Sequence, residues 1–245
     1  MIPKIIHYCW LSNDSYPEKV QFCISSWKRN LPDYKIVLWD LNKFNIDTTK
    51  WTRQAFDAKK YAFAADYIRC YALYNYGGIY LDSDVEVLKT FNELLDLPYF
   101  IGQDCSKAIE AAVVGCEKGN FLYKNMLSYY ESRDFIKNDG RYDIKAMPDI
   151  MDEVASSLYE FKVINKKEDF EFNEKILNLF TSDYFSPKRQ NDFKINLSDK
   201  TFSIHHFNAS WYPPKKKLFR KISQLIGFEI ASKFSKIVKS ACGKK

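Results

Sequence analysis

Residues 77–84 read Gly77-Gly78-Ile79-Tyr80-Leu81-Asp82-Ser83-Asp84, and the architecture of the chain can be worked out from them. Two glycines end a preceding helix, a short apolar strand follows, and two carboxylates stand at its far end. Side chains two positions apart in a strand point the same way, so Asp82 and Asp84 can converge on one ligand. Carboxylate oxygens suit Mn²⁺ or Mg²⁺, which can bridge them to a diphosphate. We therefore expect transfer of a group away from a nucleoside diphosphate.

The residues before this strand strengthen that interpretation, because an Asp-x-Asp pair alone arises by chance about once in a chain of this composition. Residues 61–76 predict a helix that ends at Gly77. Asp66 and Arg69 lie three apart on one face of this helix, and a hydroxyl-rich ligand needs such a pair of acceptor and donor. The alternative for this pair is an exposed ion pair within the helix, which adds little to stability.

The same residues carry a resemblance to a known family through the spacing Ala65-Asp66-x-x-Arg69 and then Leu73-x-x-x-Gly77-Gly78-x-Tyr80-x-Asp82-x-Asp84. This pattern resembles glycosyltransferase family 32, which has an Asp-x-Asp sugar-binding region and includes mannosyltransferases and capsular polysaccharide enzymes. The glucosylating clostridial toxins and, more loosely, family 8 share the signature. The family's first strand is similar to Pro3-Lys4-Ile5-Ile6-His7-Tyr8-Cys9-Trp10. Its closing segment is similar to His205-His206-Phe207-Asn208-Ala209-Ser210-Trp211, with Ala209 where the family often has Gly.

The resemblance implies an α/β fold of GT-A type, with a Rossmann-like, mixed but mainly parallel sheet flanked by helices over residues 1–211. It implies a catalytic set of Asp66, Arg69, Asp82 and Asp84. It also implies a divalent cation, Mn²⁺ or Mg²⁺, held by Asp84 with Asp82 and His206 assisting. For the nucleotide and sugar it implies, besides Asp66, Arg69 and Asp82, the residues Tyr8, Trp10, Ser210 and Trp211.

The chain has only three histidines, His7, His205 and His206. Most isolated histidines are structural, but a pair beside Ser210 and Trp211 offers a metal ligand to accompany Asp84. Adjacent residues in an extended segment point to opposite faces, so only one of the pair can serve. The family resemblance favours His206 over His205.

Alternating signals along the chain predict strands and helices that build a parallel sheet with right-handed crossovers. We expect strands at 5–10, 34–39, 79–81 and 99–104, and helices at 18–29, 52–76, 121–131 and 148–161. Ligands of such sheets bind beyond the carboxyl ends of the strands, where Trp10 and Asp82 fall. The loop 11–17 contains no glycine, so neither a dinucleotide fingerprint nor a Walker loop is present and a metal must hold the diphosphate.

Two further candidate site residues, Gln103 and Asp104, are chosen only because they lie at the end of an expected strand. Gln103 and Asp104 could reach the sugar or the acceptor, or they could cap a turn or helix. Trp10 could flank the nucleobase or belong to the core, since most aromatic side chains in a domain are buried.

Length and composition fit one domain, because 245 residues with 46% hydrophobic content can bury a core without disulfides. The six cysteines show no Cys-x-x-Cys spacing and the start shows no secretory leader, so we expect reduced thiols in the cytoplasm. No stretch approaches the roughly 18 to 20 apolar residues of a membrane-spanning helix.

The net charge of +6 is concentrated at the carboxyl end. The segment from Tyr212 onward contains ten basic residues and one acidic residue, Glu229, and so has a net charge of +9. The rest of the chain therefore has a net charge of −3. A mildly acidic body argues against a nucleic-acid binder. An apolar stripe in residues 212–245 predicts a basic amphipathic helix on an anionic membrane, at Ile222, Ile226, Ile230, Phe234 and Ile237. A helix packed on the domain and a solvated tail are the alternatives, and Pro213-Pro214 marks the boundary.

Together these features predict a metal-dependent, retaining hexosyltransferase. The expected donor is UDP-galactose or UDP-glucose, and the expected acceptor is a lipid-linked saccharide in bacterial surface polysaccharide synthesis, at the cytoplasmic face of the inner membrane. GDP-mannose is the alternative donor. Rival classes are a metal-dependent nucleotidyltransferase, a non-catalytic sugar-nucleotide-binding protein and a membrane-bound interaction protein.

Overall fold

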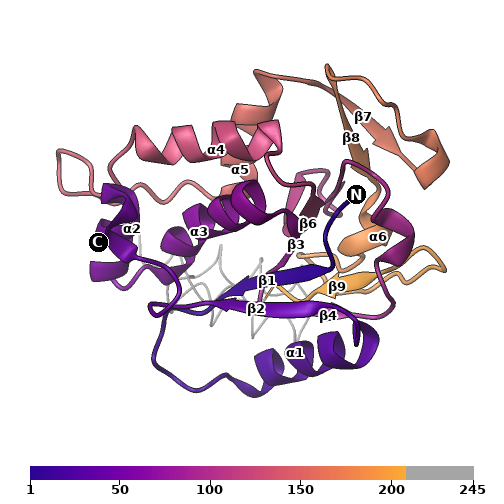
Figure 1. Cartoon of the computed structure of the whole chain (residues 1–245), viewed down its shortest axis with the longest axis horizontal. Coiled ribbons are helices and arrows are strands. Elements are labelled where there is room, and N and C mark those ends of the chain that lie inside the picture. Colours follow the sequence, from indigo (N-terminus) through magenta and orange to yellow (C-terminus); the bar gives the residue numbers. More distant parts are fainter. Residues whose placement is uncertain (208–245) are drawn as a thin grey trace, which may run out of the picture.

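The computed structural model describes residues 1–207, which build a seven-stranded sheet with helices on both faces (Figure 1). The strand order is β2-β1-β3-β6-β5-β8-β7. The bounds are β1 (Ile5–Cys9), β2 (Lys35–Trp39), β3 (Gly78–Leu81), β5 (Tyr99–Gln103), β6 (Ile109–Cys116), β7 (Glu160–Ile164) and β8 (Ile176–Phe180). A second, two-stranded sheet pairs β4 (Val85–Val87) with β9 (Ser203–His205).

The large sheet is mixed but mainly parallel. Parallel pairs join β2 to β1, β1 to β3, β5 to β8 and β8 to β7. Strand β6 runs antiparallel to both of its neighbours, β3 and β5. Every residue of β6 is buried, which explains its apolar composition. The predicted α/β class of GT-A type is confirmed. The antiparallel strand β6 makes the sheet mixed rather than purely parallel.

Two helical layers enclose the sheet (Figure 1). Helix α1 (Glu18–Asn30) packs on one face, while α2 (Lys50–Asp57), α3 (Tyr61–Tyr76), α4 (Phe121–Glu131) and α5 (Met147–Ser156) cover the other. The remaining short elements are α6 (Ser182–Phe185) and three 3-10 turns, Ile46–Thr48, Asn92–Leu94 and Lys167–Asp169. Strand β1 divides its side chains between the layers: Ile6 and Tyr8 face the α1 side, and Cys9 faces the α3 side.

Two predicted helices differ from the structure. The stretch 52–76 is two helices because Lys59 has a positive φ of 56° and the backbone turns between them. The stretch 148–161 ends as a helix at Ser156, and β7 begins at Glu160 because its residues pair with β8. In the second case long-range pairing overrides the local pattern.

The double glycine after α3 lets the chain enter the central strand. Both residues have positive φ, +63° at Gly77 and +99° at Gly78. A Cβ on Gly78 would lie 2.7 Å from the carbonyl oxygen of Ile5 on the neighbouring strand. The buried His7 fixes this turn, since its Nε2 lies 2.8 Å from the Gly77 carbonyl and its Nδ1 accepts from the Trp39 indole. His7 is therefore structural.

The predicted segment 212–245, together with Ser210 and Trp211, lies outside the described residues. Within residues 1–207, none of the helices combines the length and apolar character needed to cross a bilayer. The five cysteines in that range are all free thiols.

Candidate active site

The paired aspartates stand where β3 leaves the sheet, as the sequence predicted. The Asp82 N–H donates to the Ala112 carbonyl of β6, and the Val85 N–H donates back to the Asp82 carbonyl. This turn starts β4, whose Val85 lies opposite His205 of β9. The pairing brings Asp82, Asp84 and His205 together, with one ligand atom from each lying within 4.8 Å of the others. Two segments far apart in sequence thus form one cluster.

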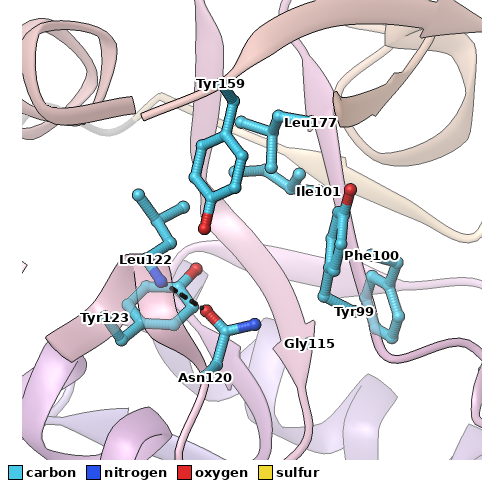
Figure 2. Close-up of a pocket in the computed structure, with 9 residues that line it drawn as sticks. All are labelled: Tyr99, Phe100, Ile101, Gly115, Asn120, Leu122, Tyr123, Tyr159 and Leu177. Carbon is cyan, nitrogen blue, oxygen red and sulfur yellow. Dashed lines mark hydrogen bonds between the residues drawn. The ribbon is translucent and has the colours of Figure 1, made fainter. Parts of the chain in front are cut away.

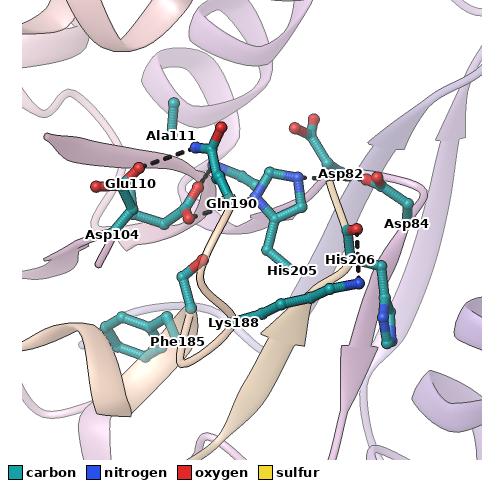
Figure 3. Close-up of polar contacts among 12 residues, drawn as sticks. Asp82, Asp84, Asp104, Glu110, Ala111, Phe185, Lys188, Gln190, His205 and His206 are labelled. Atoms are coloured by element: carbon teal, nitrogen blue, oxygen red, sulfur yellow. Dashed lines mark hydrogen bonds and ion pairs between the residues drawn. The ribbon is translucent and has the colours of Figure 1, made fainter. Parts of the chain in front are cut away.

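The two adjacent histidines meet different carboxylates, and Figure 3 shows His205 between Glu110 and Asp84. His205 Nε2 lies 3.6 Å from Asp84 Oδ1, and its Nδ1 lies 3.3 Å from Glu110 Oε2. His206, the ligand favoured from the sequence, instead places Nε2 2.8 Å from Glu86 Oε2. The strand alternation we expected does separate the two rings, but the register of β9 on β4 puts His205, not His206, beside the aspartates. This geometry corrects the choice of histidine.

Negative charge surrounds His205 in this structure. Burial alone would lower its pKa, but the charges of Glu110 and Asp84 outweigh burial and raise it to about 9. Glu110 shows the reciprocal effect: burial would raise its pKa, while the charge on His205 holds it below the usual range. A cation that binds Nε2 of His205 would therefore compete with a proton on that nitrogen.

Arg69 ties α3 to the strands that carry the acids. Its Nη1 donates to the Ala111 carbonyl at 2.6 Å, and its Nη2 lies 2.7 Å from Asp82 Oδ1. The guanidinium also stacks over the Tyr80 ring at 4.5 Å. Although burial alone would lower it, the charge of Asp82 holds the pKa of Arg69 well above its usual range. The alternative considered for Asp66 and Arg69, an exposed ion pair within the helix, does not apply because Arg69 is buried.

Asp66 joins the same group from one turn earlier in α3. Its Oδ1 lies 3.5 Å from Arg69 Nη2. Burial raises the pKa of Asp66 to about 7, with Arg69 opposing the shift. Burial likewise raises the pKa of Asp82, again against Arg69. The four residues of the predicted catalytic set, Asp66, Arg69, Asp82 and Asp84, are therefore brought together.

Glu110 belongs to this site and was missed by the sequence analysis. It is only 4% exposed, on a strand whose other residues are uncharged. A single carboxylate within a fully apolar run is itself a signal, because such a group is buried only with strong partners.

Tyr8 and Trp10, predicted to contact the nucleotide, lie at the end of β1. Tyr8 is buried against Trp27, and its hydroxyl lies 3.2 Å from that of Tyr16. Trp10 is half-buried, packs edge-on against Tyr16 and donates its indole N–H to the Asp14 carbonyl. Trp10 thus has exposed surface for a ligand, whereas the Tyr8 ring is part of the core.

Gln103 and Asp104, also predicted near the sugar, close a loop between β5 and β6. Asp104 Oδ1 accepts from the Ser106 and Ala108 N–H groups, and its Oδ2 accepts from the Gln190 amide. Gln103 donates to the Lys107 carbonyl at 3.3 Å. These bonds correspond to the turn-capping alternative considered for the pair.

A separate pocket lies between α4 and the sheet (Figure 2). None of its lining residues is charged, and none belongs to the cluster of Asp82, Asp84 and His205, which we call the acid cluster. The lining residues are Tyr99, Phe100, Ile101, Gly115, Asn120, Leu122, Tyr123, Tyr159 and Leu177. Because a diphosphate needs cationic partners or a metal, this pocket does not suit a nucleotide sugar.

The acid cluster does suit a divalent cation. Two carboxylates and one imidazole form a mixed oxygen and nitrogen set that could hold a divalent metal ion. The Nε2 atom of His205 is the nitrogen turned toward Asp84, so it is the one available to a cation.

A mixed sheet with an Asp-x-Asp pair at the end of a central strand defines the class of GT-A-type glycosyltransferases. Residues 17–101 match the model of the family described as glycosyltransferase sugar-binding region containing DXD motif. The resemblance drawn from the sequence is confirmed.

Curated relatives include inositol phosphoceramide mannosyltransferase 3 of Schizosaccharomyces pombe, 37% identical over 123 residues that cover 49% of this chain and 34% of that protein. Mannosyl phosphorylinositol ceramide synthase SUR1 of Saccharomyces cerevisiae is 31% identical over 146 residues, 56% of this chain and 37% of that protein. The matched part thus spans about a third of the length of these relatives.

Among solved structures, the PaToxG glycosyltransferase aligns with a TM-score of 0.49 and 20% identity, covering 64% of this chain and 68% of that one. The galactosyltransferase LgtC aligns with a TM-score of 0.44 and 13% identity, covering 94% and 95%.

Proposed function

We propose that this protein is a metal-dependent mannosyltransferase that moves a mannosyl group from GDP-mannose to a lipid-linked acceptor. The observation that carries the proposal is the convergence of Asp82, Asp84 and His205 at the end of β3. The two aspartates lie within residues 17–101, which match a sugar-binding glycosyltransferase family. Asp66 and Arg69, which could bind sugar hydroxyls, would then lie beside the cation site that binds the diphosphate.

The choice of mannose rests on relatives rather than on geometry. Both relatives described above are named for mannosyl transfer, which supports the donor that the sequence analysis placed second. UDP-galactose and UDP-glucose, placed first there, become the competing donors in the test below.

In the mechanism we propose, Asp82, Asp84 and His205 would hold a divalent cation, which would supply electrostatic stabilisation for the departing diphosphate. Arg69 orients the Asp82 carboxylate through the 2.7 Å contact and stays fixed by its bond to Ala111. Asp66, with a pKa of about 7, can accept a hydrogen bond from a sugar hydroxyl or donate one near neutral pH. The acceptor hydroxyl attacks the anomeric carbon as the bond from that carbon to the diphosphate oxygen breaks, and the leaving diphosphate takes up the hydroxyl proton. The family resemblance implies retention of configuration.

For the acceptor we propose a lipid-linked saccharide or glycolipid at the cytoplasmic face of a membrane. The basic residues from 212 onward support a surface of anionic lipid, because charges of +9 concentrated there are attracted to it. The two relatives also carry lipid names, inositol phosphoceramide and phosphorylinositol ceramide.

The test incubates the purified full chain and Mn²⁺ separately with GDP-mannose, UDP-galactose and UDP-glucose, and follows release of the nucleoside diphosphate. We expect GDP release to be fastest and to fall at least about 100-fold in Asp84→Asn. The matched control is Asp33→Asn, which changes a half-exposed aspartate paired with Lys4 and should leave the rate unchanged. Release of the sugar 1-phosphate in place of the nucleoside diphosphate would identify transfer of the nucleotidyl group instead, and absence of turnover with all donors would contradict the proposed activity.

A further inference from the structure

Glu110 is a carboxylate at an almost fully buried position. It is 4% exposed and is the single charged residue of β6, whose eight residues are all buried. Burying a carboxylate costs several kcal/mol unless it is paired and hydrogen-bonded. The partners that Glu110 has therefore indicate what it does.

Each oxygen of this carboxylate has its own donor. Oε1 accepts from the Ala112 N–H at 2.8 Å, within the same strand. Oε2 lies 3.3 Å from Nδ1 of His205, which comes from β9. The other nitrogen of that ring, Nε2, faces Asp84 Oδ1 at 3.6 Å. Figure 3 shows the imidazole held between Glu110 on one side and Asp84 on the other.

The backbone beside Glu110 connects to the remaining site residues. The Ala111 carbonyl accepts from Arg69 Nη1, and the Ala112 carbonyl accepts from the Asp82 N–H. Residues 110–112 thus contact Arg69, Asp82 and His205 at once. Because this short segment is buried, pairs with β5 at Glu110 and is bonded to Asp82 and Arg69, it is a firm support for the cluster.

We propose that Glu110 is a positioning residue that holds the His205 ring and keeps its proton on Nδ1, which leaves Nε2 free to bind a cation beside Asp82 and Asp84. Imidazole ligands commonly donate their second N–H to a carboxylate, which sets the tautomer and the ring orientation. This inference rests on the proposed function, because it assigns a role within the same cation site.

Replacement of Glu110 by glutamine makes the proposal testable, because the amide keeps the shape but has only one acceptor atom. The Ala112 N–H and the His205 Nδ1–H each need an acceptor, and glutamine cannot serve both. If its oxygen serves Ala112, its NH₂ donates to Nδ1 and the ring proton moves to Nε2, the nitrogen that faces Asp84. If the oxygen serves His205, the buried Ala112 N–H loses its partner.

The experiment measures Mn²⁺ affinity of the full chain by calorimetry, without any donor, for the wild type, Glu110→Gln and Glu86→Gln. The last variant is a matched control, since Glu86 contacts His206 as Glu110 contacts His205. We expect Mn²⁺ affinity to fall about 10- to 100-fold in Glu110→Gln and to stay unchanged in Glu86→Gln.

A second measurement does not require any variant to fold. With diamagnetic Cd²⁺ bound to the wild type, the imidazole nitrogen chemical shifts of His205 should show a protonated Nδ1 and a coordinated Nε2. A proton on Nε2 would overturn the proposal. Unchanged Mn²⁺ affinity in Glu110→Gln would also overturn it, as would a loss confined to Glu86→Gln, which would assign the ligand role to His206.

The outcomes separate this inference from the proposed function. Wild-type protein that binds no Mn²⁺ would overturn both the positioning role and the metal-dependent mechanism. Wild-type protein that binds Mn²⁺ through Nε2 of His205, with weakened binding in Glu110→Gln but no donor turnover, would support the positioning role and contradict the transferase activity alone.

Discussion

Arg69 Nη2 lies 2.7 Å from Asp82 Oδ1, although the two residues come from a helix and from the strand end that follows it. The same guanidinium donates to the Ala111 carbonyl, so α3, β3 and β6 meet at one buried side chain. The orientation of Asp82 therefore depends on Arg69 as much as on its own turn. We infer that Arg69 both supports the site and stabilises the fold.

Arg69→Met should destabilise the protein by about 3 kcal/mol, because it leaves the buried Asp66 and the half-buried Asp82 without their cation and removes the donor to Ala111. Denaturant unfolding measures this change. The matched control is Arg53→Met, since Arg53 pairs with Asp47 and Asp57 at the surface and its loss should cost less than about 1 kcal/mol. Equal losses in the two variants would show that burial of the Arg69 pair is unimportant.

Gly78→Ala should destabilise the protein by about 3 kcal/mol, because φ is +99° and the new Cβ would lie 2.7 Å from the Ile5 carbonyl oxygen. Gly119→Ala is the control, with φ of +79° but no atom within 4 Å of the new Cβ, and it should cost about 1 kcal/mol. Thermal unfolding of both variants compares backbone strain alone with strain plus a close contact. A smaller loss for Gly78 than for Gly119 would contradict this interpretation of the turn.

His7 should make the protein less stable in acid. Burial lowers its pKa from 6.5 to about 4, so the folded state prefers the neutral ring that accepts from Trp39. This contribution is complete above pH 6.5 and is lost as the pH falls toward 4, by at most about 3 kcal/mol. Unfolding free energies of the wild type and His7→Gln between these pH values test it. A parallel pH dependence in the two proteins would rule out His7 as the source.

Deletion of residues 215–245 should release the protein from anionic vesicles and leave donor hydrolysis largely intact. The reason is that the basic residues lie in that segment, whereas the acid cluster of Asp82, Asp84 and His205 precedes it in the sequence. Vesicle sedimentation and donor hydrolysis measure the two effects. Loss of hydrolysis together with vesicle binding would favour a tail that packs on the domain.

Local sequence patterns predicted much of the fold. Helix α4 begins and ends where expected, α1 extends one residue beyond its predicted end, and the double glycine marks the entry to β3. These elements depend on local periodicity and on backbone freedom at glycine, which the sequence displays directly. The aspartates at the end of β3 followed from the same signals.

What local patterns could not predict depends on pairing between distant segments. Strand β6 is a short apolar run whose insertion between β3 and β5 is set by the sheet, not by its own residues. Glu110 on that strand was missed for the same reason. Alternation correctly indicated that only one of His205 and His206 faces the aspartates, but the register of β9 on β4 decides which one.

The most direct test of the central claim is the location of Mn²⁺ by anomalous diffraction in crystals of the full chain grown with Mn²⁺ and GDP. Our account predicts one strong peak bound by Asp82, Asp84 and Nε2 of His205, with the diphosphate on its open side. A peak bound by Glu86 and His206, or no peak beside the two aspartates, would contradict it.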